Sequence, residues 1–114
     1  MSVSAESLRD NVEPEDVALF TAFTLTATFW LLFSTFIALI ISFKFPYPDL
    51  GASSALSFGR LRAIHTNDAF WGWASVALSG AALYVAARTS GTAIAGKRFA
   101  WAGLILVNLA TVLG

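Results

Sequence analysis

The sequence predicts an all-α, polytopic membrane protein with two complete transmembrane helices and the start of a third. Hydrophobic residues make up 57% of the chain and charged residues 12%, whereas soluble domains have roughly 45–50% and 25%. The charges are also segregated, since none lies between Asp16 and Lys44, between Asp68 and Arg88, or after Arg98. A membrane-spanning helix needs about 20 apolar residues, and each uncharged stretch supplies all or most of them.

Composition also excludes several classes of protein and site. The formal net charge is zero, which gives no indication of a nucleic-acid partner, so the lipid membrane is the expected surrounding. The absence of cysteine excludes disulfides, thiolate iron–sulfur ligation and a covalently attached c-type haem within this chain. The acidic N-terminus and the length of the first apolar run argue against a cleaved signal peptide, whose apolar region has about 7–15 residues.

The first transmembrane helix is predicted over residues 17–43, after a polar and acidic tail that we expect to be solvated. The sequence EPED at residues 13–16 suits a helix start, because proline is tolerated in the first turn and acids favour the positive helix end. Trp30 lies near the middle of the membrane rather than at its interface, so we expect it to fill a gap between helices. One face carries hydroxyls at helical spacing and is expected to pack on other helices. These residues are Thr21, Thr24, Thr28 and Thr35.

The second and third helices are predicted over residues 62–87 and 99–114. The loop before the second helix has the proline, glycine and aromatic residues of a turn, and residues 52–57 form either a short surface helix or an extended segment. The last 16 residues rise about 24 Å, short of a hydrocarbon core of roughly 30 Å. We therefore expect residues 1–114 to be the N-terminal transmembrane portion of a longer protein.

The distribution of basic residues gives a weak orientation. The first loop and the start of the second helix carry three, and the opposite side carries four. Positive residues favour the cytoplasmic side, so the N-terminus and the second loop are predicted to be cytoplasmic. The first set is Lys44, Arg60 and Arg62, and the second is Arg9, Arg88, Lys97 and Arg98.

The chain has one histidine, His65, near the start of the second predicted helix. Neutral imidazole is a common axial ligand of haem iron, and Arg62, one turn earlier, could pair with a haem propionate. On the same helix face Gly72 leaves room for a flat macrocycle. The same features have structural alternatives: an interfacial histidine bonded to a carbonyl, Arg60 and Arg62 reaching lipid phosphates, and a glycine that lets another helix approach.

Asp68 lies one turn further into the membrane than His65. A carboxylate at this depth is costly and is a functional candidate by default. It could orient the His65 ring through the nitrogen that does not face the iron, face a water-filled pocket, or pair with an arginine.

Residues 57–67, which read SFGRLRAIHTN, resemble the start of the second helix in the catalytic subunit of haem–copper oxidases. The resemblance is closest to the cbb3-type cytochrome c oxidase branch, whose motif reads roughly GRLRPLHTN, and the related nitric oxide reductases come next. FWGW at 70–73 and LYVAART at 83–89 are similar to the continuation in that branch. Two departures stand out: Ala63 replaces the usual proline, and Asp68 replaces a small or apolar residue.

The resemblance implies the N-terminal part of a twelve-helix-type subunit I, with His65 as one axial ligand of a low-spin haem b. It implies that Arg62 contacts the propionate region, with Arg60 a weaker candidate. Members of the family reduce oxygen at a high-spin haem beside copper and pump protons, and work with c-type cytochrome subunits in the bacterial inner (plasma) membrane. The second haem ligand, the high-spin haem and the copper are expected outside this chain.

Three alternatives remain open at the level of sequence. The chain could be a fragment of a nitric oxide reductase large subunit, whose distinguishing residues lie beyond Gly114. It could be a small stand-alone protein in which two copies each donate His65 to one haem b. It could also be an assembly subunit without a cofactor, which the threonine and small-residue faces would suit.

Overall fold

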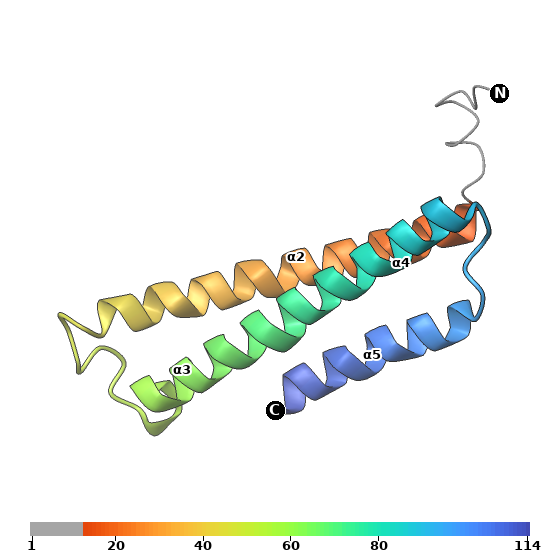
Figure 1. The fold of residues 1–114 in the computed structure, drawn as a ribbon. Coiled ribbons are helices and arrows are strands. Elements are labelled where there is room, and N and C mark those ends of the chain that lie inside the picture. The colour runs from red at the N-terminus through yellow and green to blue at the C-terminus, as the bar shows by residue number, and fades with distance from the viewer. Residues whose placement is uncertain (1–12) are drawn as a thin grey trace.

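The computed structural model describes residues 13–114, which form three long helices, each antiparallel to the one before it (Figure 1). The first is α2, Pro14–Phe43. The second is one continuous rod made of α3 (Phe58–Asn67), a π-helical segment η2 (Asp68–Ser75) and α4 (Val76–Ser90). The third is α5, Lys97–Leu113. The predicted acidic tail up to residue 12 lies outside the described residues.

The prediction of an all-α membrane protein is confirmed. Two helices, Pro14–Phe43 and Phe58–Ser90, are long and apolar enough to cross a membrane. Their 30 and 33 residues rise about 45 and 50 Å, which exceeds a hydrocarbon core of roughly 30 Å. The helix ends therefore extend beyond the apolar layer.

The helix bounds differ from the predicted ones, and capping residues at both ends of the second rod extend it beyond the apolar run. The second rod starts at Phe58 rather than at residue 62, since the Ser57 hydroxyl accepts a hydrogen bond from the Arg60 N–H at 3.5 Å. It ends at Ser90, where Gly91 has φ 63° and closes the helix in the left-handed conformation. The first and third helices likewise begin earlier than predicted, at Pro14 and Lys97. Of the two possibilities for residues 52–57, a short 3₁₀ turn (η1, Ser54–Leu56) is observed.

The π-helical segment η2 was not predicted from the sequence. The Ser75 hydroxyl donates to the Phe70 carbonyl at 2.8 Å, five residues earlier, which matches the wider turn. A π turn changes the angle at which every later side chain leaves the helix, and such turns often occur at functional sites. Consequently the faces of α3 and α4 do not follow one uniform helical wheel.

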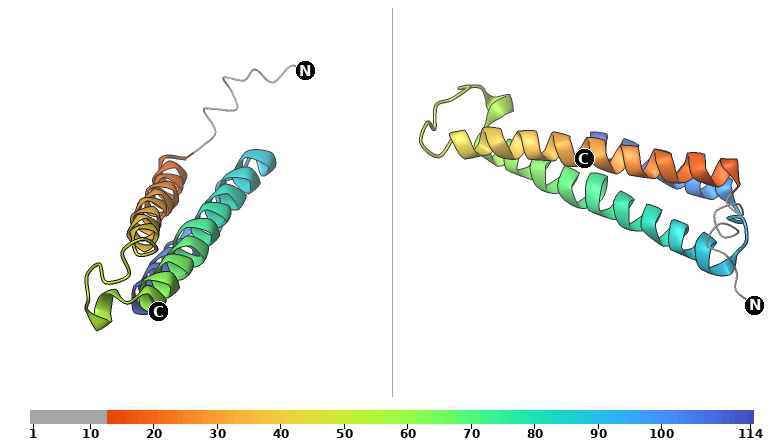
Figure 2. Two further views of the ribbon diagram at one scale, coloured as in Figure 1. Left: turned by 90° about the vertical axis from the view of Figure 1, so that its left-hand side faces the viewer. Right: turned by 90° about the horizontal axis from the view of Figure 1, so that it is seen from above.

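The helix α2 and the second rod lie side by side (Figure 2), and the core lies where these two and α5 meet. Two glycines permit this close approach. A Cβ on Gly72 would lie 2.5 Å from Trp30 Cγ, and a Cβ on Gly80 would lie 2.8 Å from Phe23 Cβ. The prediction that Trp30 fills a gap between helices is therefore confirmed. The buried core cluster consists of Leu19, Phe23, Ala27, Val76 and Leu104.

The threonine face of α2 is not the face that packs within the described residues. Thr24, Thr28 and Thr35 are exposed, and each hydroxyl donates to the carbonyl four residues earlier. Because the hydroxyls are satisfied by their own helix, they need no partner on a neighbour. The buried face of α2 instead carries Asp16, Leu19, Phe23, Ala27, Trp30, Ser34 and Ile37.

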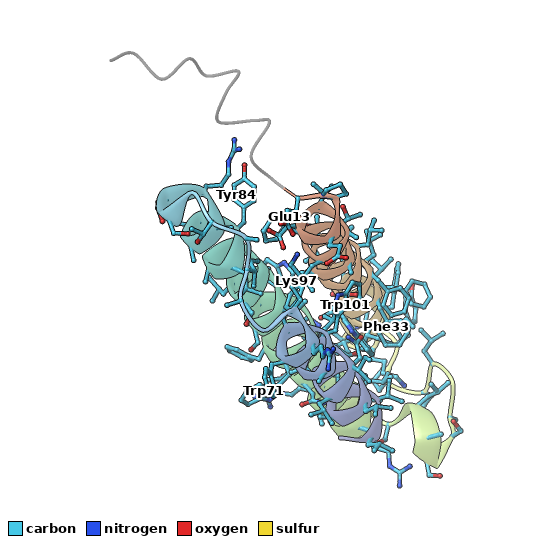
Figure 3. The ribbon with its side chains drawn as sticks, turned by 90° about the vertical axis from the view of Figure 1, so that its right-hand side faces the viewer. Glu13, Phe33, Trp71, Tyr84, Lys97 and Trp101 are labelled. Atoms are coloured by element: carbon cyan, nitrogen blue, oxygen red, sulfur yellow. The ribbon has the colours of Figure 1, made fainter. Side chains whose placement is uncertain are left out.

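An ionic cluster ties the start of α5 to the start of α2 (Figure 3). Lys97 Nζ lies 2.8 Å from Glu13, 3.2 Å from Glu15 and 3.1 Å from Asp16. Asp16 is buried, and its Oδ2 also accepts the Ile94 N–H at 3.3 Å. The hydrogen bond to Glu13 is the main cause that holds the pKa of Lys97 above its usual value. The lysine therefore stays charged against the buried carboxylate.

We predict that Gly80→Ala lowers stability by about 1–3 kcal/mol, because the added methyl has no room beside Phe23. Thermal unfolding of the detergent-solubilised protein, followed by circular dichroism, measures the change. Gly103→Ala is the control, since a Cβ there meets nothing within 4 Å. Equal loss in both variants would contradict the close contact between α2 and α4.

We predict that Lys97→Met lowers the Tm, because the buried Asp16 carboxylate loses its cation. Adding Asp16→Asn should recover most of the loss, since no buried charge is then left unpaired. The raised pKa means that the contribution of Lys97 is complete below the ordinary lysine value and is lost as the pH rises through the raised one. A double variant no more stable than Lys97→Met would argue against this pairing.

Candidate functional site

His65 on α3 contacts α2 through Ser34. Its Nδ1 lies 2.9 Å from the Ser34 carbonyl oxygen and 2.9 Å from the Ser34 hydroxyl oxygen. The Ser34 hydroxyl lies 3.1 Å from the His65 carbonyl oxygen, to which it can donate. A carbonyl oxygen only accepts, so Nδ1 carries the proton and donates it toward Ser34. Every polar group in this contact between the two helices then has a partner.

This arrangement determines what the imidazole can do. With the proton on Nδ1, the neutral ring keeps a lone pair on Nε2, and the side chain is half-buried rather than enclosed. Metal-ligating histidines usually donate their other ring N–H to an acceptor such as a backbone carbonyl, because this hydrogen bond fixes both the tautomer and the orientation of the ring. His65 therefore fits the role of an axial haem ligand.

Sequence reasoning missed Ser34, which makes this contact. Ser34 is 2% exposed and lies one turn after Trp30 on the buried face of α2. A signal was present, because Ala27, Trp30, Ser34 and Ile37 recur at the three- and four-residue spacing of a buried stripe. A small hydroxyl residue inside such a stripe indicates a polar partner on the facing helix.

The structure separates Arg62 from His65 more than the sequence suggested. Arg62 is exposed and lines a groove of about 680 Å³ together with Thr66, Phe70 and Trp71, and His65 does not line this groove. Trp71 points away from the helices (Figure 3). Arg60 is also exposed. Both arginines lie in the first turns of the helix, so they stand at its aqueous end while His65 faces α2.

The expected open surface at Gly72 is covered. The Trp30 ring lies against this glycine, so closely that a methyl group could not be accommodated. An indole ring thus takes the space that was expected beneath a macrocycle. Of the two roles considered for Gly72, the described residues show the close approach of a neighbouring helix.

Of the three roles considered for Asp68, the described residues do not show the first, a hydrogen bond that orients His65. Ser34 takes the Nδ1 contact instead. Asp68 is 3% exposed, and its Oδ2 has no hydrogen-bond partner among the described residues. A buried polar atom without a partner is unfavourable, and a buried charge more so. Asp68 is therefore a costly residue within a spanning helix.

Within residues 13–114 no group of three or more histidine, cysteine or acidic side chains could hold a metal ion. A haem differs from a free ion, because its macrocycle supplies four ligands and the protein adds only axial ones. The chemistry of this donor set thus suits haem better than a protein-ligated metal. One axial position can be met by His65, the only histidine of the chain.

The fold is that of a helical membrane protein, and His65 is its one histidine, held by a hydrogen bond to α2. The chain belongs to the family described as cytochrome c and quinol oxidase polypeptide I, whose family model matches residues 18–114. The resemblance to haem–copper oxidase subunit I is thereby confirmed at the level of the family. The cbb3 branch stays a prediction.

Curated relatives agree with this family. The chain is 34% identical over 96 residues to cytochrome c oxidase subunit 1 of Rhodobacter capsulatus, covering 76% of this chain and 18% of the relative. It is 25% identical over 77 residues to the cytochrome c oxidase subunit 1 homolog of Agrobacterium tumefaciens, and 34% over 79 residues to that of Azorhizobium caulinodans. Each of these two alignments covers 68% of this chain and 14% of the relative. The chain thus spans less than a fifth of the length of these relatives. No solved structure matches it.

We predict that Asp68→Asn stabilises the protein by about 1–3 kcal/mol, because the amide keeps the shape and removes a buried charge without a partner at Oδ2. Thermal unfolding in detergent measures this. Asp49→Asn, in the exposed first loop, is the control and should change little. A clear loss of stability in Asp68→Asn would mean that the carboxylate has a favourable partner.

Proposed function

We propose that this chain is the N-terminal transmembrane portion of subunit I of a terminal respiratory oxidase of the cbb3-like branch. In this proposal His65 is one axial ligand of the low-spin haem b that delivers electrons for oxygen reduction. The family membership and the motif at residues 57–67 support the class of protein. The contact of His65 Nδ1 with the Ser34 carbonyl carries the assignment of the ligand.

The role of His65 follows from its hydrogen bond. Haem b supplies one-electron redox chemistry when bound. The Ser34 carbonyl oxygen accepts a hydrogen bond from Nδ1–H, so Nε2 is the nitrogen that would face the iron. The same bond would restrain rotation of the ring and so keep the orientation of a ligating imidazole fixed. The second axial histidine would come from a later part of the protein.

The arginines at the start of α3 fit the anionic edge of such a cofactor. Arg62 and Arg60 are exposed in the first turns of the helix, where the helix dipole is positive. A propionate at this aqueous end could be met by a guanidinium in a charge-assisted bond. Arg62 is the stronger candidate, and Gly72 drops out as a haem contact because Trp30 covers it.

The remaining parts of the proposed oxidase lie outside this chain. The high-spin haem and copper would be held by the remainder of subunit I, and electrons would arrive through c-type cytochrome subunits. The location would be the bacterial inner (plasma) membrane, with the N-terminus cytoplasmic, as the charge distribution favours. The nearly neutral, lipid-facing composition does not suit nucleic-acid binding.

The test is His65→Ala in the full-length protein. We expect loss of the low-spin haem b absorption in the reduced-minus-oxidised difference spectrum and one haem fewer per enzyme, with electron delivery abolished. Ile64→Ala, an exposed neighbour on the same helix, is the control and should keep the spectrum. A His65→Ala enzyme with an intact low-spin spectrum would refute the ligand assignment.

A further inference from the structure

Next to the contact between His65 and Ser34, α2 makes a second contact with the second rod, between Trp30 and Gly72. Trp30 lies one turn before Ser34 on α2 and packs against Gly72 of η2 so closely that a Cβ would come within 2.5 Å of the ring. Trp30 is 6% exposed. With no side chain between the ring and the helix backbone, the position of the indole directly sets how far α2 stands from the second rod.

The indole is held in turn by the third helix. Trp30 Nε1 donates a hydrogen bond to Asn108 Oδ1 on α5 at 2.8 Å. The Asn108 amide donates to the Leu104 carbonyl at 2.8 Å, which fixes the orientation of its own side chain. A buried indole N–H in an apolar environment needs an acceptor, so breaking this bond has a cost that favours one orientation of the ring.

We propose that Trp30 and Asn108 are positioning residues for His65. The Asn108 hydrogen bond sets the orientation of the indole on Gly72, and the indole sets the position of α2. Ser34 then presents its carbonyl and hydroxyl to Nδ1 at the observed distances. The third helix thus controls the plane of the ligating imidazole without touching it. This inference rests on the proposed function of His65.

A second ring-on-glycine contact between α2 and the second rod has no hydrogen bond to α5 and serves as the control. Phe23 packs against Gly80 just as Trp30 packs against Gly72, with a hypothetical Cβ 2.8 Å from Phe23 Cβ. Phe23 belongs to the same buried face of α2 but has no hydrogen-bonding group in its side chain. It lies three turns from Ser34. Replacing Phe23 therefore disturbs packing of the same kind, far from the histidine.

The experiment uses the full-length, haem-loaded protein. Trp30→Phe keeps a ring on Gly72 and removes the N–H, and Asn108→Leu removes the acceptor. The readouts are the largest g value of the oxidised low-spin haem in electron paramagnetic resonance, which reports the imidazole planes, and the haem midpoint potential. Ser34→Ala supplies the reference shift for loss of the side-chain part of the contact to His65.

We expect Trp30→Phe and Asn108→Leu to shift both readouts in the direction of Ser34→Ala, and the double variant Trp30→Phe with Asn108→Leu to match either single one. Asn108→Gln, which keeps a side-chain acceptor, should leave the largest g value and the midpoint potential as they are in the unaltered protein. Phe23→Leu should lower the Tm without moving either readout. Unchanged readouts in Trp30→Phe and Asn108→Leu, or an equal shift in Phe23→Leu, would overturn the inference.

The outcome is separable from that of the proposed function. A low-spin haem retained in His65→Ala overturns the ligand assignment and, with it, the positioning role. Loss of that haem in His65→Ala, together with unchanged readouts in Trp30→Phe and Asn108→Leu, overturns the positioning role alone.

Discussion

The contact between His65 and Ser34 is the constraint on which the candidate site depends. It joins two antiparallel helices through both the backbone and the side chain of one serine, and it leaves no polar group of that contact without a partner. In an apolar medium such saturation is a requirement, because water is not present to satisfy what remains. The histidine is therefore held in one tautomer, with Nε2 as the ring nitrogen that the contact with Ser34 leaves free.

Close helix packing makes that contact possible. Small residues allow membrane helices to approach, since dispersion contacts rather than water exclusion hold them together. Gly72 and Gly80 receive Trp30 and Phe23, and these two contacts fix the spacing of α2 and the second rod over several turns. Polar groups add direction to this packing where they occur, as Trp30 and Asn108 do between α2 and α5.

The acidic residues have different partners at the helix starts and within the membrane-spanning part of the chain. Where α2 and α5 begin, Lys97 pairs with the buried Asp16 and with two exposed glutamates, so the negative charges at the start of α2 have a cation beside them. Asp68 lies within the spanning rod, and its Oδ2 has no such compensation among the described residues. A protein retains a costly carboxylate at such a place only where the surroundings or the function make use of it.

The sequence by itself determined the class of the protein and offered its one candidate imidazole ligand, His65. Long uncharged runs specify spanning helices, the motif around His65 specifies the family, and both are local properties of the chain. Only the tertiary structure decided the partners. Ser34 lies 31 residues from His65, and Asn108 lies 78 from Trp30. Such pairs depend on how the helices are rotated and shifted against one another. The unpredicted π-helical segment Asp68–Ser75 changes the rotation of the second rod. In the resulting arrangement Gly72 contacts the Trp30 ring, and Arg62 lines a groove to which His65 does not contribute.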